Sequence, residues 1–117
     1  MSAHAGRAAE EIAARHYLST GAELLEERWR CAEGEIDLVV ALGKALVFIE
    51  VKQRKRLNTM DSPVSLKQWR RLEAAANQYI VGYTDDTGVQ PFCRFDVALI
   101  GHDGTVQIIE NAWSSRT

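Results

Sequence analysis

One aspartate, one glutamate and one lysine fall where two neighbouring strands could bring them together. Asp37 lies in the apolar segment 34–40, and Glu50 and Lys52 lie in the apolar segment 46–52. Two adjacent buried carboxylates would repel each other and cost several kcal/mol unless a cation compensates them. A hard divalent ion such as Mg²⁺ (or Mn²⁺) takes oxygen ligands of this kind. With a lysine beside them, the acids are suited to metal-assisted hydrolysis of a phosphodiester.

The two segments are predicted to form a β-hairpin, because apolar runs flank a glycine-containing turn at residues 43–44. In this register Asp37 lies opposite Glu50 and Glu35 lies opposite Lys52, whereas a slip by one residue would put the two acids on opposite faces. A simpler interpretation is that Glu50 and Lys52 form a structural ion pair and Asp37 ends a surface strand. The matched register of both motifs favours a site.

The composition predicts one globular domain spanning residues 1–117, with 46% hydrophobic and 26% charged residues. No apolar run approaches the ~20 residues that span a bilayer, and residues 1–15 lack the apolar core of a signal peptide. Cys31 and Cys93 are far apart and have no ligand neighbours at zinc spacing. We therefore expect a cytoplasmic protein with reduced thiols and no membrane partner.

Basic residues concentrate between positions 52 and 71, where seven lysines and arginines accompany one acidic residue, although the whole chain has a net charge of −2. A basic stretch that begins at the candidate catalytic lysine could bind a phosphate backbone by electrostatic attraction. The alternative is a solvated face of loop and helix, as most charge runs are. The candidate nucleic-acid-binding residues are Arg54, Lys55, Arg56, Lys67, Arg70 and Arg71.

Periodicity and turn residues predict the elements that position these side chains. They are, in order, a helix over 3–19, a strand over 23–31, the hairpin over 34–52, a helix from 66 to about 81 or 83, and strands over 92–100 and 106–110. The irregular segment 53–64 is predicted to be a loop at the mouth of the site. Ser65 and Gln68 have the spacing of a capping box. This order predicts an α/β sandwich around a mixed sheet.

The chain resembles the YraN-like family of uncharacterised bacterial proteins. That family is assigned to the restriction-endonuclease-like (PD-(D/E)xK nuclease) superfamily, close to Holliday-junction resolvases. The resemblance covers nearly the whole chain. Its matching segments are GRAAE at 6–10, GEIDL at 34–38, VFIEVK at 47–52, Lys67, CRFDV at 93–97 and NAW at 111–113. The resemblance implies a restriction-endonuclease-like sandwich, with a central mixed sheet flanked by helices.

The resemblance also implies roles for individual residues. The superfamily signature is an acidic residue in one strand and Glu-x-Lys in the next, often with a glutamate from a helix. Spacing alone leaves Glu10 and Glu11 equally open as that glutamate, and the family match selects Glu10. The implied catalytic residues are Asp37, Glu50, Lys52 and Glu10, and the implied metal ligands are Asp37, Glu50 and the Val51 carbonyl.

A few positions are open to other interpretations. Asp96 is either a structural aspartate bonded to Arg94 or backbone, or a ligand. Arg28 stands where the resembled family often has asparagine, and Gln53 stands where it often has Thr or Arg. The three tryptophans are predicted to belong to the core rather than to a platform for bases.

Together these features lead us to expect a nucleic-acid-binding protein and a Mg²⁺- or Mn²⁺-dependent endonuclease that hydrolyses DNA, with branched DNA among its candidate substrates. The alternative is a noncatalytic nucleic-acid-binding or protein-interaction module on the same fold. A single site of this kind acts on one strand. Symmetric cutting of both strands would need two copies, which favours a homodimer.

Overall fold

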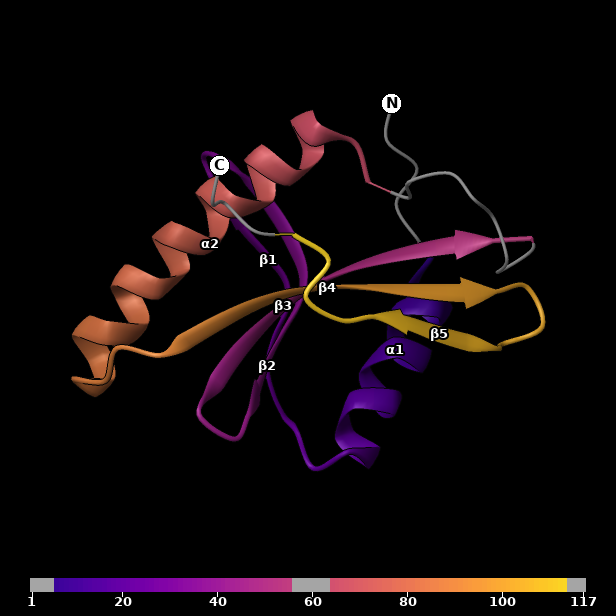
Figure 1. Cartoon of the computed structure of the whole chain (residues 1–117), viewed down its shortest axis with the longest axis horizontal. Coiled ribbons are helices and arrows are strands. Elements are labelled where there is room, and N and C mark those ends of the chain that lie inside the picture. The colour runs from indigo at the N-terminus through magenta and orange to yellow at the C-terminus, as the bar shows by residue number, and fades with distance from the viewer. Residues whose placement is uncertain (1–5, 56–63, 114–117) are drawn as a thin grey trace.

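The computed structural model describes residues 6–55 and 64–113, which form a mixed five-stranded sheet with a helix on each face (Figure 1). The elements are α1 (Arg7–Ser19), β1 (Glu23–Cys31), β2 (Gly34–Leu42), β3 (Ala45–Arg54), α2 (Leu66–Thr87), β4 (Phe92–Gly101) and β5 (Val106–Ile109). The strands lie in the order β1-β2-β3-β4-β5, and only the β3–β4 pair of this sheet is parallel. The predicted α/β sandwich and its order of elements are confirmed.

The central strands are buried on both faces, which explains their nearly continuous apolar sequence. One face of the hairpin, with Val47 and Ile49, packs against α1, and the other, with Leu46 and Phe48, packs against α2. Side chains alternate along a strand. Glu50 therefore continues the face of β3 that α2 covers.

The observed boundaries differ from the predicted ones around α2. The helix continues to Thr87, so its predicted end at about residue 81 or 83 is wrong. Gly88 ends the helix instead, because its left-handed backbone (φ 72°) lets its N–H bond the carbonyl of Thr84 at 2.8 Å. Strand β3 reaches Arg54, so the predicted loop begins later than residue 53. Residues 1–5 and most of that loop, 56–63, lie outside the described residues.

The predicted hairpin register is confirmed from Leu42–Ala45 to Leu38–Ile49. Pairing of β2 with β1 continues further, to Cys31–Gly34. The first part of β2 therefore follows β1, and the space between β2 and β3 opens at Asp37. This divergence also explains why the predicted pairing of Glu35 with Lys52 is wrong: Glu35 lies opposite Arg30 on β1 and pairs with it, 3.4 Å apart.

Asp96 is a structural residue of β4, as one of the two interpretations predicted. Its carboxylate is fully buried and accepts two hydrogen bonds from Arg94, one from the hydroxyl of Tyr17 and one from the backbone N–H of Asn111. These bonds join α1, β4 and the turn that follows β5. Burial and the neighbouring Asp96 raise the pKa of Tyr17 above its ordinary range, so this hydroxyl stays protonated as a donor.

Neither helix within the described part of the chain is long and apolar enough to cross a membrane.

Candidate functional site

A cleft of about 400 Å³ opens where β2 and β3 diverge below the first turns of α2. Asp37 and Glu50 both line it and are only 4% and 7% exposed. Arg30 lines it from β1, and Lys67 and Arg71 line it from α2. The structure therefore brings the two predicted acids together in one cleft with basic side chains on two sides.

Glu50 is held by two neighbours that also contact each other. Its Oε2 atom lies 3.3 Å from Nζ of Lys52 and accepts a hydrogen bond of 2.5 Å from Nε2 of Gln68. The Lys52 ammonium in turn donates to Oε1 of Gln68 at 3.3 Å. Lys52 is 8% exposed, so its charge acts in a largely desolvated setting. This closed set of contacts fixes the orientation of both charged groups.

Asp37 is held from the opposite strand. Its Oδ2 atom accepts a hydrogen bond of 2.8 Å from the backbone N–H of Val51, the residue between Glu50 and Lys52. The peptide around Val51 is thereby placed beside both acids. The carboxyl groups of Asp37 and Glu50 are also close enough to hydrogen-bond each other. The pair is therefore convergent, as the sequence predicted.

The electrostatics of this pair are unbalanced. Burial, followed by the charge of Glu50, raises the pKa of Asp37 to about 8. Burial also raises the pKa of Glu50, against the opposing effect of Lys52. One ammonium does not compensate two buried carboxylates. The pair therefore keeps a proton near neutral pH unless another cation binds to it.

The donor atoms present fit a hard divalent cation. Asp37 and Glu50 offer carboxylate oxygens and Val51 offers a carbonyl, which is the type of ligand that Mg²⁺ and Mn²⁺ prefer. Such a cation would neutralise the negative charge of the two acids that Lys52 does not offset. Within residues 6–55 and 64–113, however, no group of three or more His, Cys, Asp or Glu side chains gathers around one point. The protein would thus supply few ligands, as is usual for Mg²⁺.

Glu10, the predicted helical carboxylate, approaches from the other face of the sheet. It is 6% exposed and interacts electrostatically with Asp37. Its Oε1 atom is bonded to Nε of Arg28 at 2.7 Å. Its neighbour Glu11 points outward, with a side chain 56% exposed and paired to Arg15. The structure thus separates the two alternatives: Glu10 is buried near Asp37 and Glu11 is not.

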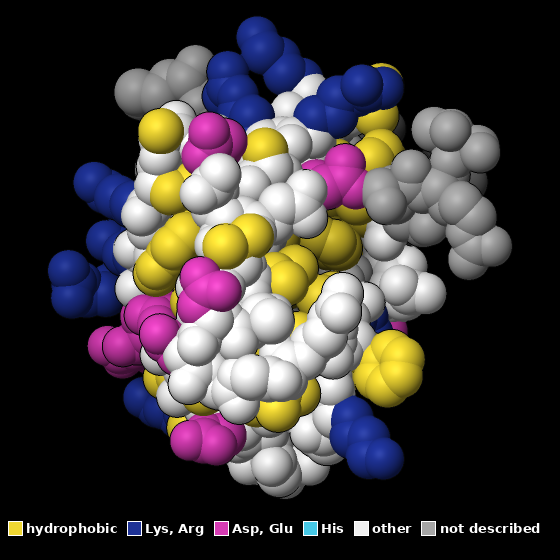
Figure 2. Space-filling view, turned by 90° about the vertical axis from the view of Figure 1, so that its left-hand side faces the viewer, with side chains coloured by type: hydrophobic (Ala, Val, Ile, Leu, Met, Phe, Trp, Pro, Cys, Tyr) yellow, Lys and Arg dark blue, Asp and Glu magenta, His cyan; other side chains and the backbone are white. Residues whose placement is uncertain are grey.

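The candidate nucleic-acid-binding residues fall into separate groups. Lys67 and Arg71 line the cleft, and Figure 2 shows basic side chains gathered at the upper end of the molecule, where α2 begins in Figure 1. Arg70 lies over an adjacent shallow groove. On β3, Arg54 donates to the carbonyl of Gln53 at 3.1 Å, and the next residue, Lys55, is exposed. Arg56 lies outside the described residues.

Sequence reasoning missed the role of Gln68. Its spacing from Ser65 predicted a capping box, and the serine does accept the backbone N–H of Gln68 at 3.1 Å. The side chain of Gln68, which would complete that box, instead bridges Glu50 and Lys52. Only the packing of α2 over β3 reveals this contact. Arg30 was missed as well, because its strand offered no functional pattern.

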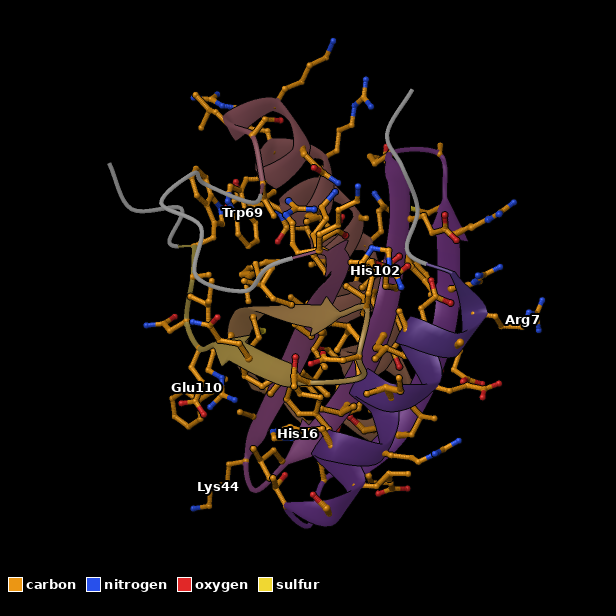
Figure 3. All side chains as sticks on the ribbon, turned by 90° about the vertical axis from the view of Figure 1, so that its right-hand side faces the viewer. Arg7, His16, Lys44, Trp69, His102 and Glu110 are labelled. Carbon is orange, nitrogen blue, oxygen red and sulfur yellow. The ribbon has the colours of Figure 1, made fainter. Side chains whose placement is uncertain are left out.

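The three tryptophans pack with other hydrophobic side chains of the core between the sheet and α2. Trp69 is 6% exposed and stacks on Trp113 with ring centroids 5.6 Å apart, and Trp29 packs edge-on against Tyr79. Their prediction as core residues is confirmed. Figure 3 shows His16 on α1 well separated from His102 in the β4–β5 turn, and Trp69 belongs to the first turn of α2.

The fold and the cleft define an α/β sandwich with a pair of buried acids at a break in its sheet. Residues 9–100 match the uncharacterised protein family UPF0102. A UPF0102 protein of Cereibacter sphaeroides is 39% identical over 115 residues, which cover 98% of this chain and 97% of that protein. A UPF0102 protein of Ruegeria pomeroyi is 39% identical over 109 residues (93% and 87%), and one of Frankia casuarinae is 38% identical over 102 residues (86% and 84%). The chain belongs to the UPF0102 family, and its resemblance to YraN-like proteins is confirmed.

Proposed function

We propose that this protein is a divalent-metal-dependent endonuclease that hydrolyses phosphodiester bonds of DNA. The observation that carries the proposal is the convergence of Asp37 and Glu50 in a basic-lined cleft, where Lys52 is the cation in salt-bridge contact with the pair among the residues that the structure describes. Buried acids that lack compensation are costly to the fold, so their retention in a cleft points to a cationic ligand and a chemical role. The resemblance to the restriction-endonuclease-like superfamily adds a fold-level analogy.

Asp37, Glu50 and the Val51 carbonyl would hold the metal. A bound Mg²⁺ or Mn²⁺ would stabilise negative charge on the phosphate and make a water molecule a better nucleophile. Lys52 is fixed beside Glu50, where its ammonium can orient that water or stabilise charge in the transition state. Gln68 holds Glu50 and Lys52 in this arrangement.

The substrate would enter along the basic rim of the cleft. Lys67 and Arg71 on one side and Arg30 on the other can contact phosphates that flank the scissile one. Branched DNA is the substrate that the resemblance to Holliday-junction resolvases suggests. A second copy of the chain would be needed to cut both strands symmetrically, so we expect a homodimer on such a substrate.

The test is Mg²⁺-dependent nicking of four-way junctions and of duplex DNA. We expect cleavage by the wild type and by Glu11→Gln, a control on the exposed neighbour of Glu10, and loss of cleavage in Asp37→Ala and Lys52→Ala. Each variant should first be shown to be folded by circular dichroism. Cleavage that persists in both Ala variants would rule out the proposal. Salt-dependent DNA binding without cleavage in any divalent ion would support the noncatalytic alternative instead.

A second test measures the metal directly. Calorimetric titration of Mn²⁺ into the wild type should detect binding, and Asp37→Asn should abolish it while preserving the shape of the side chain. Equal binding by both proteins would contradict the assignment of Asp37 as a ligand.

A further inference from the structure

We propose that this site holds a single divalent cation, because the guanidinium of Arg28 supplies at Glu10 the positive charge that a second cation would otherwise bring. The inference rests on the proposed function, since it concerns the metal content of the same site. Arg28 is then a further residue of the site, in addition to Asp37, Glu50 and Lys52.

The first observation is the contact between Glu10 and Arg28. Nε of Arg28 lies 2.7 Å from Oε1 of Glu10, a distance typical of a strong charge-assisted hydrogen bond. The carboxylate of Glu10 is 8% exposed in this pair, so water does little to screen it. A cation that used Glu10 as a ligand would have to compete with a guanidinium that is already in place. Within the described residues, no three His, Cys, Asp or Glu side chains gather closely enough to hold a metal ion between them.

The second observation is the backbone of Arg28 itself. Its φ angle is 49°, in the left-handed region that long side chains avoid, although it lies within strand β1. The strand pairs on either side, Glu27–Leu38 and Trp29–Ile36, stay in register. Strain of this kind persists only where the surroundings hold it in place. The ion pair with Glu10 and these two flanking strand pairs provide that constraint.

The third observation is the balance of charge. Glu10, Asp37 and Glu50 are three buried acids, and among the described residues Arg28 and Lys52 are the cations bonded to two of them. Glu35 also lines the cleft, but it is paired with Arg30. One divalent cation therefore outweighs the remaining negative charge. A second would add two more positive charges close to Arg28 and Lys52 before any phosphate is bound.

The test counts Mn²⁺ ions per chain by calorimetry and by electron paramagnetic resonance, which distinguishes an isolated Mn²⁺ from a neighbouring pair. We expect one ion per wild-type chain, with the spectrum of an isolated ion. We expect two ions per chain, with the broadened spectrum of a pair, for Arg28→Asn. Asparagine tolerates the left-handed backbone and removes the charge. Arg28→Gly is a second variant with the same expected count, since glycine adopts this backbone freely.

Two controls assign the second ion to Glu10. The double variant Arg28→Asn/Glu10→Gln should return to one ion per chain, and Arg28→Lys, which keeps the charge, should bind one. Arg7 shares the groove beside Glu10 but its side chain points away from the molecule, so we do not expect it to replace Arg28 (Figure 3).

Two ions in the wild type would overturn this inference and leave the proposed nuclease intact. One ion in both Arg28→Asn and Arg28→Gly would also overturn it, because Arg28 would then not be what excludes the second. If the wild type binds no Mn²⁺, this inference fails together with the metal site on which it rests.

Discussion

Asp96 and Asp37 are both aspartates buried in the sheet, at 0% and 4% exposure. Asp96 receives four hydrogen bonds, two of them from Arg94, so its charge and its lone pairs are satisfied within the protein. Asp37 receives one backbone hydrogen bond and faces Glu50, another buried acid. The first carboxylate is thus held by an arginine of its own strand, whereas the second lines an open cleft and forms no salt bridge with any residue that the structure describes.

This difference separates a buried acid with a structural role from a buried acid with a candidate functional role. Burial alone does not separate these two residues, because both are nearly inaccessible. Their partners separate them: a bidentate arginine and two further donors in one case, and a second acid in the other. This contrast can be tested by changing each acid in turn, and removal of the Asp96 carboxylate should have the largest effect of the single substitutions.

Asp96→Ala should lower the free energy of unfolding by about 3–5 kcal/mol, because it leaves Arg94 without its partner and removes the acceptor of the buried Tyr17 hydroxyl and of the Asn111 N–H. Urea unfolding at neutral pH measures this loss. Asp86→Ala, on the exposed last turns of α2, is the control and should change stability by less than about 0.5 kcal/mol. A similar small effect in both variants would contradict a structural role for Asp96.

Asp37→Asn should have the opposite effect on stability. It should raise the free energy of unfolding by about 1 kcal/mol at about pH 8 without metal. The amide removes the repulsion with Glu50, and its oxygen can still accept the N–H of Val51. The same urea experiment measures the gain. A clear loss of stability would place Asp37 in the same structural class as Asp96.

The wild type should become less stable as pH rises from about 4 to about 8. In this range the native state keeps a proton on the Asp37–Glu50 pair, because its pKa is raised, while the unfolded chain has released it. Stability from a raised carboxyl pKa is therefore lost as pH rises, by at most about 1.4 kcal/mol per pH unit. Urea unfolding at several pH values, compared with Asp37→Asn, isolates this effect.

Saturating Mg²⁺ should remove most of this pH dependence, since the cation replaces the proton. An equal slope in the wild type and in Asp37→Asn would show that the acids are not coupled in this way.

Neutralising Lys67 and Arg71 together should weaken DNA binding. The slope of log affinity against log salt concentration should decrease by the equivalent of about one to two phosphate contacts. Affinity measured at several salt concentrations tests this. Lys44→Gln is the control, because Lys44 lies at the tip of the hairpin, away from the start of α2 (Figure 3). An equal effect of Lys44→Gln would indicate nonspecific attraction rather than binding at the cleft.

Local chemistry made part of this molecule predictable. The turn at 43–44 and the alternation of the flanking residues were enough to set the hairpin register that begins at Leu42–Ala45. That register placed Asp37 and Glu50 together. The end of α2 was predicted too early, although Gly88 carried the signal, because the polar residues before it suggested a loop.

Other features of the site could not be predicted from local patterns. The bridge from Gln68 to Glu50 and Lys52 depends on how α2 packs over β3, across 18 and 16 positions of the chain. The pairing of Glu10 with Arg28 joins α1 to β1 across 18 positions of the chain, and the left-handed backbone of Arg28 is not predicted by its residue type.

The sequence by itself determined the order of the elements, the hairpin and the two acids on it, because turns and side-chain alternation act over a few residues. Only the tertiary structure decided which charges are compensated. Arg94 reaches Asp96, Arg28 reaches Glu10 and Lys52 reaches Glu50. Asp37 is left to share a cleft with Glu50 because β2 departs from β3 at that point, and electrostatic balance in a buried site depends on distances that no sequence spacing gives.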